Sequence, residues 1–411
     1  MTQYQITVSK EILHHLFSSN DEGMKELLKQ VIDQILEQQR TEQISAGEYE
    51  RTEERQGYRN GYKPRRLTTR VGTIIMRVPQ IRNGVFSTDL FLRYQRSEQA
   101  LVLALMEMVV KGVSTCKVAA ITEELCGASF PASSVSDLCK RLDLPVRAWN
   151  ERKLSGAAYP FLIVDALVIK IRDNNRIFSY SALIATGINQ DGYREILGMR
   201  IGDSESEASW SDLFAWLKSR GLHGVDFITS DHHGGLIKAV AAHFQGATWQ
   251  RCQTHFTKNI LDACPKQHQG KLHAHLRAVF EAPDADNARS SLKATLDTFE
   301  AIAPKAMAVL EQGFESATAV SALPEHYQKR LRTTNSQERL NEEIRRRERV
   351  IRIFPNQASA ERLLGALLME QHEVWSTGRK YFEMEEYWNW KSEQSQKNVM
   401  PLRILSISSV Q

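Results

Sequence analysis

The sequence predicts an α/β protein, and three observations support this prediction. Strand-like segments follow one another at 161–172, 176–188 and 193–202, separated by the short turns DNN and NQDG. A helix, a strand, a second helix and a second strand then follow in ESEASWSDLFAWLKSRG, VDFITS, GGLIKAVAAHF and ATWQRC. Three antiparallel strands before this alternation give the element order of an RNase H-like fold.

Size and composition limit the classes of protein to consider. A chain of 411 residues can bury a substantial core and is long enough for two or three domains. Charged residues make up 25% and hydrophobic residues 42%, and apolar runs such as PFLIVDALVIKI are too short to cross a bilayer. The first residues lack the apolar core of a signal peptide, and the five cysteines form no regular framework. We therefore expect a cytoplasmic protein with reduced thiols and no membrane contact.

Residues 1–97 are predicted to be a DNA-binding region made of a helix and a basic hairpin. Apolar residues at three- and four-residue spacing predict an amphipathic helix over 22–39. The RNGY turn and the alternating LTTRVGTIIMRVP then indicate a β-hairpin, and residues 51–70 hold seven Lys or Arg against two Glu. Basic residues beside Tyr58 and Tyr62 suit phosphate contact and stacking, with a solvated hairpin as an equal alternative. The candidate DNA-binding residues here are Arg59, Lys63, Arg65 and Arg66.

Residues 98–150 are predicted to form a helix-turn-helix-like DNA-binding domain. TCKVAAITEELCG and PASSVSDLCKRLDL, between about 115 and 143, are two helical patterns joined by a short turn, and ASS supplies an N-cap for the second. The second helix of such a pair can enter the major groove of DNA, so Lys140 and Arg141 are candidate contacts. Helix pairs are also common in proteins that bind no DNA, and this alternative stays open.

The remaining chain is expected to complete the sheet domain around an insertion. The sheet domain is assigned to 151–260 and 330–365, because residues 261–329 are dense in helix formers and carry no strand signal. Residues 366–411 form a helical and aromatic C-terminal tail. Its KYFEMEEYWNWK segment is expected to pack against the chain's own body, with a partner contact as the alternative.

Asp165 and Asp231 are the first two candidate catalytic and metal-binding residues. Asp165 lies inside the most apolar strand, where an ionised carboxylate is costly unless it is paired or binds a metal; pairing with Lys170 or Arg172 is the alternative. Asp231 directly follows the strand segment VDFITS, although it could also belong to a loop or cap the helix near Gly235. In an RNase H-like sheet these two strands are neighbours, so the two carboxylates would converge and call for Mg²⁺ or Mn²⁺.

Glu338 is the candidate for the third carboxylate of this site. It lies in the first turn of the last predicted helix, TTNSQERLNEEIRRR. A purely structural alternative is a capping box with Asn335 as N-cap and Glu338 at the third helical position. Glu342 and Glu343 also compete, but their spacing from Arg346 and Arg347 favours surface ion pairs.

The helix that carries Glu338 is strongly basic. Residues 329–352 hold nine Lys or Arg against four Glu. Cations beside a metal-binding carboxylate suit a nucleic-acid backbone, whereas a basic run by itself is often only a solvated face. The candidate DNA-binding residues of this helix are Arg339, Arg345, Arg346, Arg347 and Arg349.

Several motifs follow one another along the chain: RNGY and VPQIRNG, then REILG, SDHHGGL and WQRCQTHFTKN, and finally the long RTTNSQERLNEEIRRRERVIRIFPN. With these motifs the chain resembles the bacterial insertion-sequence transposases of the IS256, or Mutator-like, type. The resemblance implies an RNase H-like catalytic domain with an all-helical insertion and a DDE active site. Its acidic residues fall on Asp165, Asp231 and Glu338, with the insertion in the longer second gap.

The histidines after Asp231 suggest a different metal. Cys252 and His255 form a CxxH pair that could join His232 or His233 in a four-ligand zinc site. The resemblance instead makes His233, Cys252 and His255 accessory residues near the active site, and it leaves His232 without a role.

Together these features predict a DDE transposase. It would bind the terminal inverted repeats of an insertion sequence and, with two Mg²⁺ or Mn²⁺ ions per site, cut DNA and transfer the strand to target DNA. A homodimer is expected because two double-stranded ends must be joined, and the place of action would be the nucleoid in the bacterial cytoplasm. The alternatives are a structure-specific nuclease without strand transfer and a DNA-binding regulator with a degenerate catalytic domain.

Overall fold

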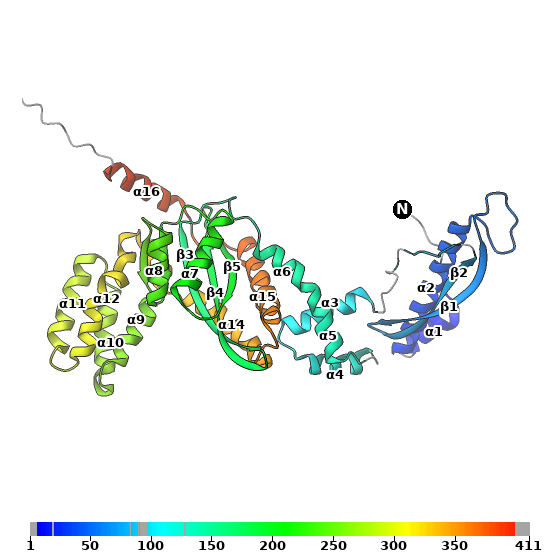
Figure 1. Cartoon of the computed structure of the whole chain (residues 1–411), viewed down its shortest axis with the longest axis horizontal. Helices are drawn as coiled ribbons and strands as arrows, with labels where there is room; N and C mark the ends of the chain where they lie inside the picture. Colours follow the sequence, from blue (N-terminus) through cyan, green and yellow to red (C-terminus); the bar gives the residue numbers. More distant parts are fainter. Residues whose placement is uncertain are drawn as a thin grey trace, which may run out of the picture. The chain divides into compact units, whose positions relative to one another are not determined.

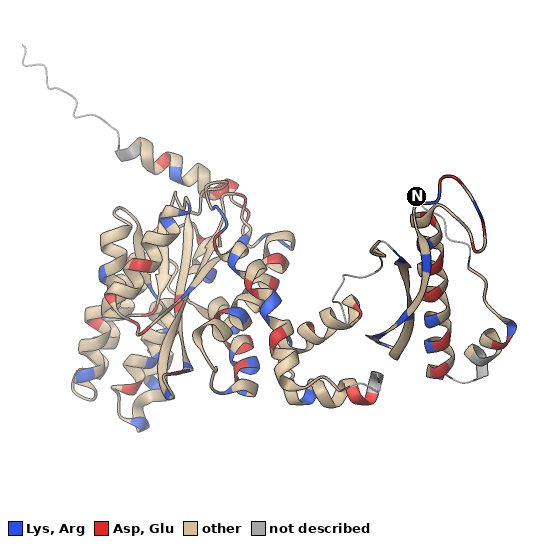
Figure 2. Cartoon of the chain, turned by 45° about the vertical axis from the view of Figure 1, so that its right-hand side comes forward, with Lys and Arg blue, Asp and Glu red and all other residues tan. Residues whose placement is uncertain are grey.

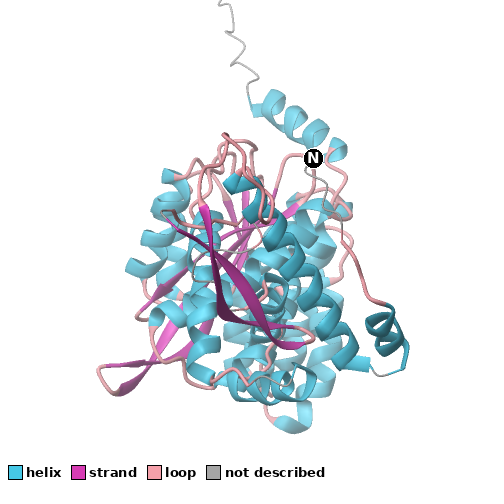
Figure 3. Ribbon diagram, turned by 90° about the vertical axis from the view of Figure 1, so that its right-hand side faces the viewer, coloured by secondary structure: helices cyan, strands magenta, loops and turns pink. Residues whose placement is uncertain are grey.

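The computed structural model describes residues 6–18, 20–82, 84–88, 90, 97–126 and 129–398. The chain divides into two compact units, Met1–Arg141 and Leu142–Gln411. Helices outnumber strands, and the strands form one two-stranded and one five-stranded sheet within the described residues (Figures 1 and 3). No helix of this described part is long and apolar enough to cross a membrane.

The first unit joins a hairpin to a group of helices. Acidic and basic residues alternate along the long helix α2 (Figure 2), whose inner side packs Leu36 against Leu67, Ile74 and Met76 of the hairpin. The other helices α3, α4 and α5 contact one another. In order, the elements are α1 (Lys10–Ser18), α2 (Asn20–Ile44), β1 (Tyr58–Thr69), β2 (Gly72–Arg82), α3 (Gln99–Val110), α4 (Thr115–Cys126), α5 (Ala132–Cys139) and the 3₁₀ turn η1 (Lys140–Leu142).

The predicted hairpin is present, but its turn lies elsewhere than expected. Thr69 pairs with Gly72, so Arg70 and Val71 make the turn. The RNGY segment lies inside β1, where the register shifts between Arg59 and Tyr62 and Gly61 adopts a φ of +74°. A glycine at positive φ is found both in β-bulges and in hairpin turns. The sequence RNGY therefore could not show which of the two this segment forms.

The second unit is built on the five-stranded mixed sheet, with strand order β5-β4-β3-β6-β7. β3, β4 and β5 form the expected antiparallel meander, and β3 also pairs in parallel with β6, which pairs in parallel with β7. The elements are α6 (Asp143–Asn150), β3 (Phe161–Asp173), β4 (Arg176–Ile188), β5 (Arg194–Gly202), α7 (Glu207–Ser219), β6 (Phe227–Ser230), α8 (Gly234–His243) and β7 (Thr248–Arg251).

Helices cover both faces of this sheet (Figure 1). Leu162 and Val164 of β3 pack with Trp210 and Phe214 of α7 and with neighbouring residues of α8. On the opposite face, apolar residues of β3, β4 and β5 pack with α14 (Asn335–Ile351) and α15 (Gln357–Thr377). Alternation along β3 therefore turns Asp165 toward the face that α14 covers.

The helical segment between β7 and α14 has a core of its own. Its elements are α9 (Gln253–Asp262), α10 (Lys266–Phe280), α11 (Ala285–Phe299), α12 (Pro304–Thr318), η2 (Ala319–Ala322) and α13 (Glu325–Leu331). Phe256, Leu276, Phe299 and Leu310 pack together in that core. The buried Gln250 amide joins it to the sheet, donating to Ala317 O and accepting from Val320 N, each at 2.7 Å.

The C-terminal aromatic segment packs against the chain's own body, as the sequence favoured. Phe382 and Tyr387 are buried with Phe161 and Tyr327. The Tyr387 hydroxyl donates to Asp226 Oδ2 at 2.6 Å, which anchors α16 (Glu385–Asn398). α15 runs across the expected domain boundary at residue 365.

Candidate active site

The Asp165 carboxylate lies on β3 under the helix α14. Its Oδ1 accepts a hydrogen bond from Ala166 N at 2.9 Å, and its Oδ2 accepts one from Asn341 Nδ2 at 2.6 Å. Burial, and then the negative charge of Asp231, raise the pKa of Asp165 to about 7. The side chain is therefore a half-buried acid facing a second acid, and within the described residues no basic side chain of β3 forms an ion pair with it.

Asp231 follows directly after β6. Because β6 pairs in parallel with β3, with Ile163 opposite Thr229, Asp165 and Asp231 lie at the same end of the two strands. The N-cap of α8 is His233, and no side chain caps that helix. Asp231 is thus not a helix cap; its Oδ1 lies 2.5 Å from His255 Nδ1.

Glu338 lies in the first turn of α14, and the capping box that was the alternative explanation for this residue is absent. The residue at the N-cap is Thr334, and no side chain caps the helix, so Asn335 is the first helical residue. Glu338 N bonds to Thr334 O at 2.9 Å, as in regular helix. The Glu338 carboxylate is not used in capping the helix, and its Oε1 lies 3.2 Å from His255 Nε2.

His255, on α9, joins two of the three carboxylates. One ring nitrogen faces Asp231 and the other faces Glu338. Interaction with the Asp231 carboxylate, and then with Cys252, raises the pKa of His255 to about 10, which makes the ring an imidazolium at neutral pH. We call Asp165, Asp231 and Glu338 the carboxylate site; His255 supplies a positive charge inside it.

Asn341 and Gln337 were missed from sequence. Asn341 stands three residues after Glu338, on the same side of α14, which is the one signal that could have found it. Gln337 is buried, and its Oε1 accepts from Thr186 Oγ1 of β4 at 2.8 Å. This bond fixes the first turn of α14 on the sheet and with it the position of Glu338.

The carboxylate site has the ligands of a hard divalent cation. The negative charge of Asp231 makes the ionised form of Asp165 more costly, and a cation between the two carboxylates would remove that cost. A softer set also occurs, since Asp231, Cys252 and His255 offer ligand atoms within 4.8 Å of one another. However, the Cys252 sulfur is buried and accepts from Thr334 N at 3.4 Å and Thr334 Oγ1 at 3.3 Å.

His232 and His233, the two histidines after Asp231, lie apart from that set. The His232 ring packs near Trp249, with 6.0 Å between ring centroids. His233 Nδ1 lies 3.9 Å from Glu205 Oε1. The structure therefore does not bring either residue into the four-ligand zinc arrangement that the sequence left open.

The competing acids of α14 are either exposed or paired with arginines. Glu342 is exposed. Glu343 accepts from Arg346 and Arg347, and these bonds, Arg346 first, lower its pKa to about 2. Both observations favour Glu338 as the third carboxylate.

The basic candidates of α14 divide into two groups. Arg347 is buried and paired with Glu343 at 2.8 Å and Glu370 at 3.6 Å, and Arg346 is paired with Glu343. The Arg347–Glu370 pair joins α14 to α15, whereas the two pairs with Glu343 lie within α14. Within the described residues, the exposed basic residues of the helix that form no ion pair are Arg339, Arg345 and Arg349.

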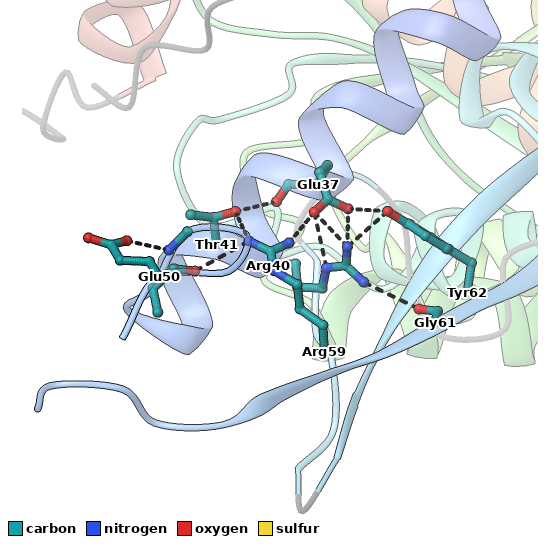
Figure 4. Close-up of polar contacts among 9 residues, drawn as sticks. Glu37, Arg40, Thr41, Glu50, Arg59, Gly61 and Tyr62 are labelled. Atoms are coloured by element: carbon teal, nitrogen blue, oxygen red, sulfur yellow. Dashed lines mark hydrogen bonds and ion pairs between the residues drawn. The ribbon is translucent and has the colours of Figure 1, made fainter. Parts of the chain in front are cut away.

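The hairpin candidates divide in the same way. The Arg59 guanidinium contacts Glu37 and donates to Thr41 Oγ1 at 2.9 Å, and Tyr62 OH donates to Glu37 Oε2 at 2.9 Å (Figure 4). Arg59 therefore ties the β1 bulge to α2. Lys63 and Arg66 are exposed, and Arg65 is half-buried.

In the helix-turn-helix candidate, both basic residues follow α5 in η1. Lys140 pairs with Asp137 at 2.7 Å and keeps 61% of its side chain exposed, and Arg141 is exposed. Their role as DNA contacts stays a prediction.

A mixed sheet that presents paired acids is consistent with the sequence resemblance. The family model described as "Transposase, Mutator family" matches residues 1–378. The chain belongs to the Mutator family of transposases. Membership of this family implies an enzyme of DNA transposition that cleaves DNA and transfers the strand.

Within this family the chain is similar to transposases of named insertion sequences. It is 44% identical over 390 residues to the transposase for IS256 in transposon Tn4001 of Staphylococcus aureus, covering 94% of this chain and 100% of that one. It is 43% identical over 386 residues to the transposase for ISRM5 of Rhizobium meliloti, covering 94% and 97%. Among solved structures, the Drosophila P element transposase strand transfer complex matches at a TM-score of 0.28 and 10% identity, over 72% of this chain and 85% of that chain.

Proposed function

We propose that this protein is a DDE transposase with an RNase H-like catalytic domain. The observation that carries the proposal is the convergence of Asp165, Asp231 and Glu338, from three separate elements, around His255. The strand order β5-β4-β3-β6-β7, with two parallel pairings after an antiparallel meander, supports the domain assignment.

Two Mg²⁺ or Mn²⁺ ions, held by the carboxylate site, would supply charge neutralisation and activation of the attacking and leaving oxygens. The chain's own residues align the reaction. Asn341 and Ala166 N orient the Asp165 carboxylate, and Gln337 fixes the turn that carries Glu338. His255 holds Asp231 and Glu338 together as a positively charged ring between them.

Two displacements at phosphorus complete the reaction. In the first, a water oxygen bonds to the phosphorus at the element's end and the 3′-oxygen leaves as a free hydroxyl. In the second, that hydroxyl oxygen bonds to a target phosphorus and the target 3′-oxygen leaves. Each step exchanges one P–O bond for another, so the enzyme contributes positioning and electrostatics rather than a covalent intermediate.

We further propose that the protein binds its DNA substrates through the exposed basic residues. These substrates are the double-stranded terminal inverted repeats and the target DNA. The protein would act on them as a homodimer, because two ends must be joined, and its place of action would be the bacterial nucleoid. On the catalytic helix the exposed candidates are Arg339, Arg345 and Arg349, and in the first unit they are Lys63, Arg66, Lys140 and Arg141.

The test is an in vitro reaction with DNA that carries an element end and a supercoiled target plasmid. The proposal expects metal-dependent nicking at the end and joined products, both lost in Asp165→Asn, Asp231→Asn and Glu338→Gln. Nicking without joined products would favour a structure-specific nuclease. Binding to the end without any nicking would favour a DNA-binding regulator.

A further inference from the structure

Three arginines from three different elements form a cluster that includes the residue next to Glu338. Arg339 follows Glu338 directly on α14, Arg194 begins β5, and Arg330 lies on α13. Arg194 and Arg330 both stack on the Tyr381 ring, and Ile196, two residues after Arg194 on β5, belongs to the same hydrophobic core as Leu340, the neighbour of Arg339 on α14. We call them the arginine cluster.

Aromatic rings hold the central arginine in a fixed plane. The Arg194 Cζ atom lies 3.3 Å from the centroid of the Trp375 ring and 4.9 Å from that of Tyr381. The Tyr381 ring also receives Arg330, whose Cζ lies 4.9 Å from the same centroid, and Arg330 donates to Tyr381 O. A stacked guanidinium presents its N–H edge in a set direction, which lysine does not.

The segment that carries Tyr381 is itself anchored to the turn before β5. Tyr381 N and Phe382 N donate to Gly192 O at 2.8 Å and 3.1 Å. A Cβ added at Gly192 would lie 1.8 Å from Phe382 O, and this glycine has a φ of +89°. Backbone hydrogen bonds therefore fix the segment that carries the Tyr381 ring beside Arg194.

The arginine cluster has no countercharge of its own. Within the described residues, neither Arg194 nor Arg339 makes an ion pair, and Arg194 Nε is buried without a hydrogen-bond partner. Burial, together with the charges of Arg330 and Arg339, lowers the pKa of Arg194 to about 10. The nearby Glu383 lies 3.8 Å from Lys380 and is 77% exposed. Three gathered cations without a carboxylate call for an anionic ligand.

We propose that the arginine cluster binds a backbone phosphate of the DNA strand that the carboxylate site cuts. The inference rests on the proposed function and adds a specific anchor for the strand. Planar guanidinium edges match phosphate oxygens in a paired geometry, and such contacts fix a strand's position without reading its sequence. Because Glu338 and Arg339 are adjacent on one rigid helix, a phosphate held by the cluster would set the register of the strand at the carboxylates.

The experiment measures binding of a labelled DNA duplex of random sequence to full-length protein at several salt concentrations. Arg339→Gln removes one exposed charge and is expected to weaken binding by about fivefold and to lower the salt-dependence slope by about one. Arg194→Lys keeps the charge but loses the planar fork, so it is expected to weaken binding with little change of slope. The control is Arg289→Gln, which removes an exposed arginine from α11 and is expected to bind as the unsubstituted protein does.

The outcomes separate this inference from the proposed function. Unchanged affinity and slope in Arg339→Gln would overturn the inference, even if nicking at element ends is intact. Absence of nicking by the unsubstituted protein would instead count against the proposed function. The salt dependence of DNA binding could still be measured and compared between the variants. Thermal unfolding of each variant, matched to the unsubstituted protein, shows that a loss of binding comes from the lost contact.

Discussion

Asn341 Nδ2 donates a 2.6 Å hydrogen bond to Asp165 Oδ2, across 176 positions of the chain. The bond joins the helix of one candidate catalytic carboxylate to the strand of another. It leaves Asp165 Oδ1 held by a backbone N–H, so both oxygens have defined directions. A carboxylate held in this way is preorganised for the work that the carboxylate site is proposed to do.

Asn341→Ala is expected to lower the rate of strand cleavage by about 10- to 100-fold, because Asp165 loses the donor that orients it. Affinity for DNA should stay the same, since the amide faces the site rather than the exposed side of α14. Single-turnover nicking and DNA binding check the two parts. The control is Glu342→Gln, an exposed change one residue away. Equal cleavage rates in both variants would remove Asn341 from the positioning role.

Mg²⁺ or Mn²⁺ is expected to raise the thermal unfolding temperature of the protein, because a cation bound by the folded state alone stabilises it by mass action. The increase should vanish in Asp231→Asn. After removal of all metals with a chelator, cleavage should return with Mg²⁺ alone and need no zinc. Recovery that depends on zinc would point instead to the Asp231, Cys252 and His255 set.

Arg59→Ala is expected to destabilise the first unit by about 1–3 kcal/mol, because it leaves a half-buried Glu37 carboxylate with one cation fewer. Lys63→Ala, a few residues along the same strand, should leave stability unchanged because that side chain is exposed. Chemical denaturation measures both values. If both variants unfold alike, the network in Figure 4 contributes little.

Glu343→Gln is expected to lower stability at neutral pH by about 1–2 kcal/mol, a value reduced for a side chain that is 34% exposed. The pKa of Glu343 is about 2 in the folded protein and 4.5 as its ordinary value. The stabilisation is therefore fully present above pH 4.5 and is lost as the pH falls through 2. Stability curves of the two proteins should converge over that range; a constant difference would show that charge is not the cause.

The sequence alone determined the order and type of the elements in the second unit. Alternating and helical periodicities are local properties, so β3, β4, β5 and the later helix–strand pairs lie close to where they were expected. The pairing of β3 with β6 was also predicted, because these two strands are neighbours in an RNase H-like sheet. Family membership came from motifs spread along the chain.

Only the tertiary structure decided what individual polar residues do. Arg59 looks like other basic residues in the sequence, but its partner Glu37 lies on α2 and neutralises it. The spacing of Glu343 and Arg347 predicts their pair, whereas the contact of Arg347 with Glu370 on α15 could not be predicted from sequence. Likewise Asn341 carries no distinctive local pattern, and its role comes from its contact with Asp165. His255 was expected near the active site, but only the structure shows that its ring lies between Asp231 and Glu338. Periodicity reports burial of a face, whereas charge pairing depends on distances between segments that only folding brings together.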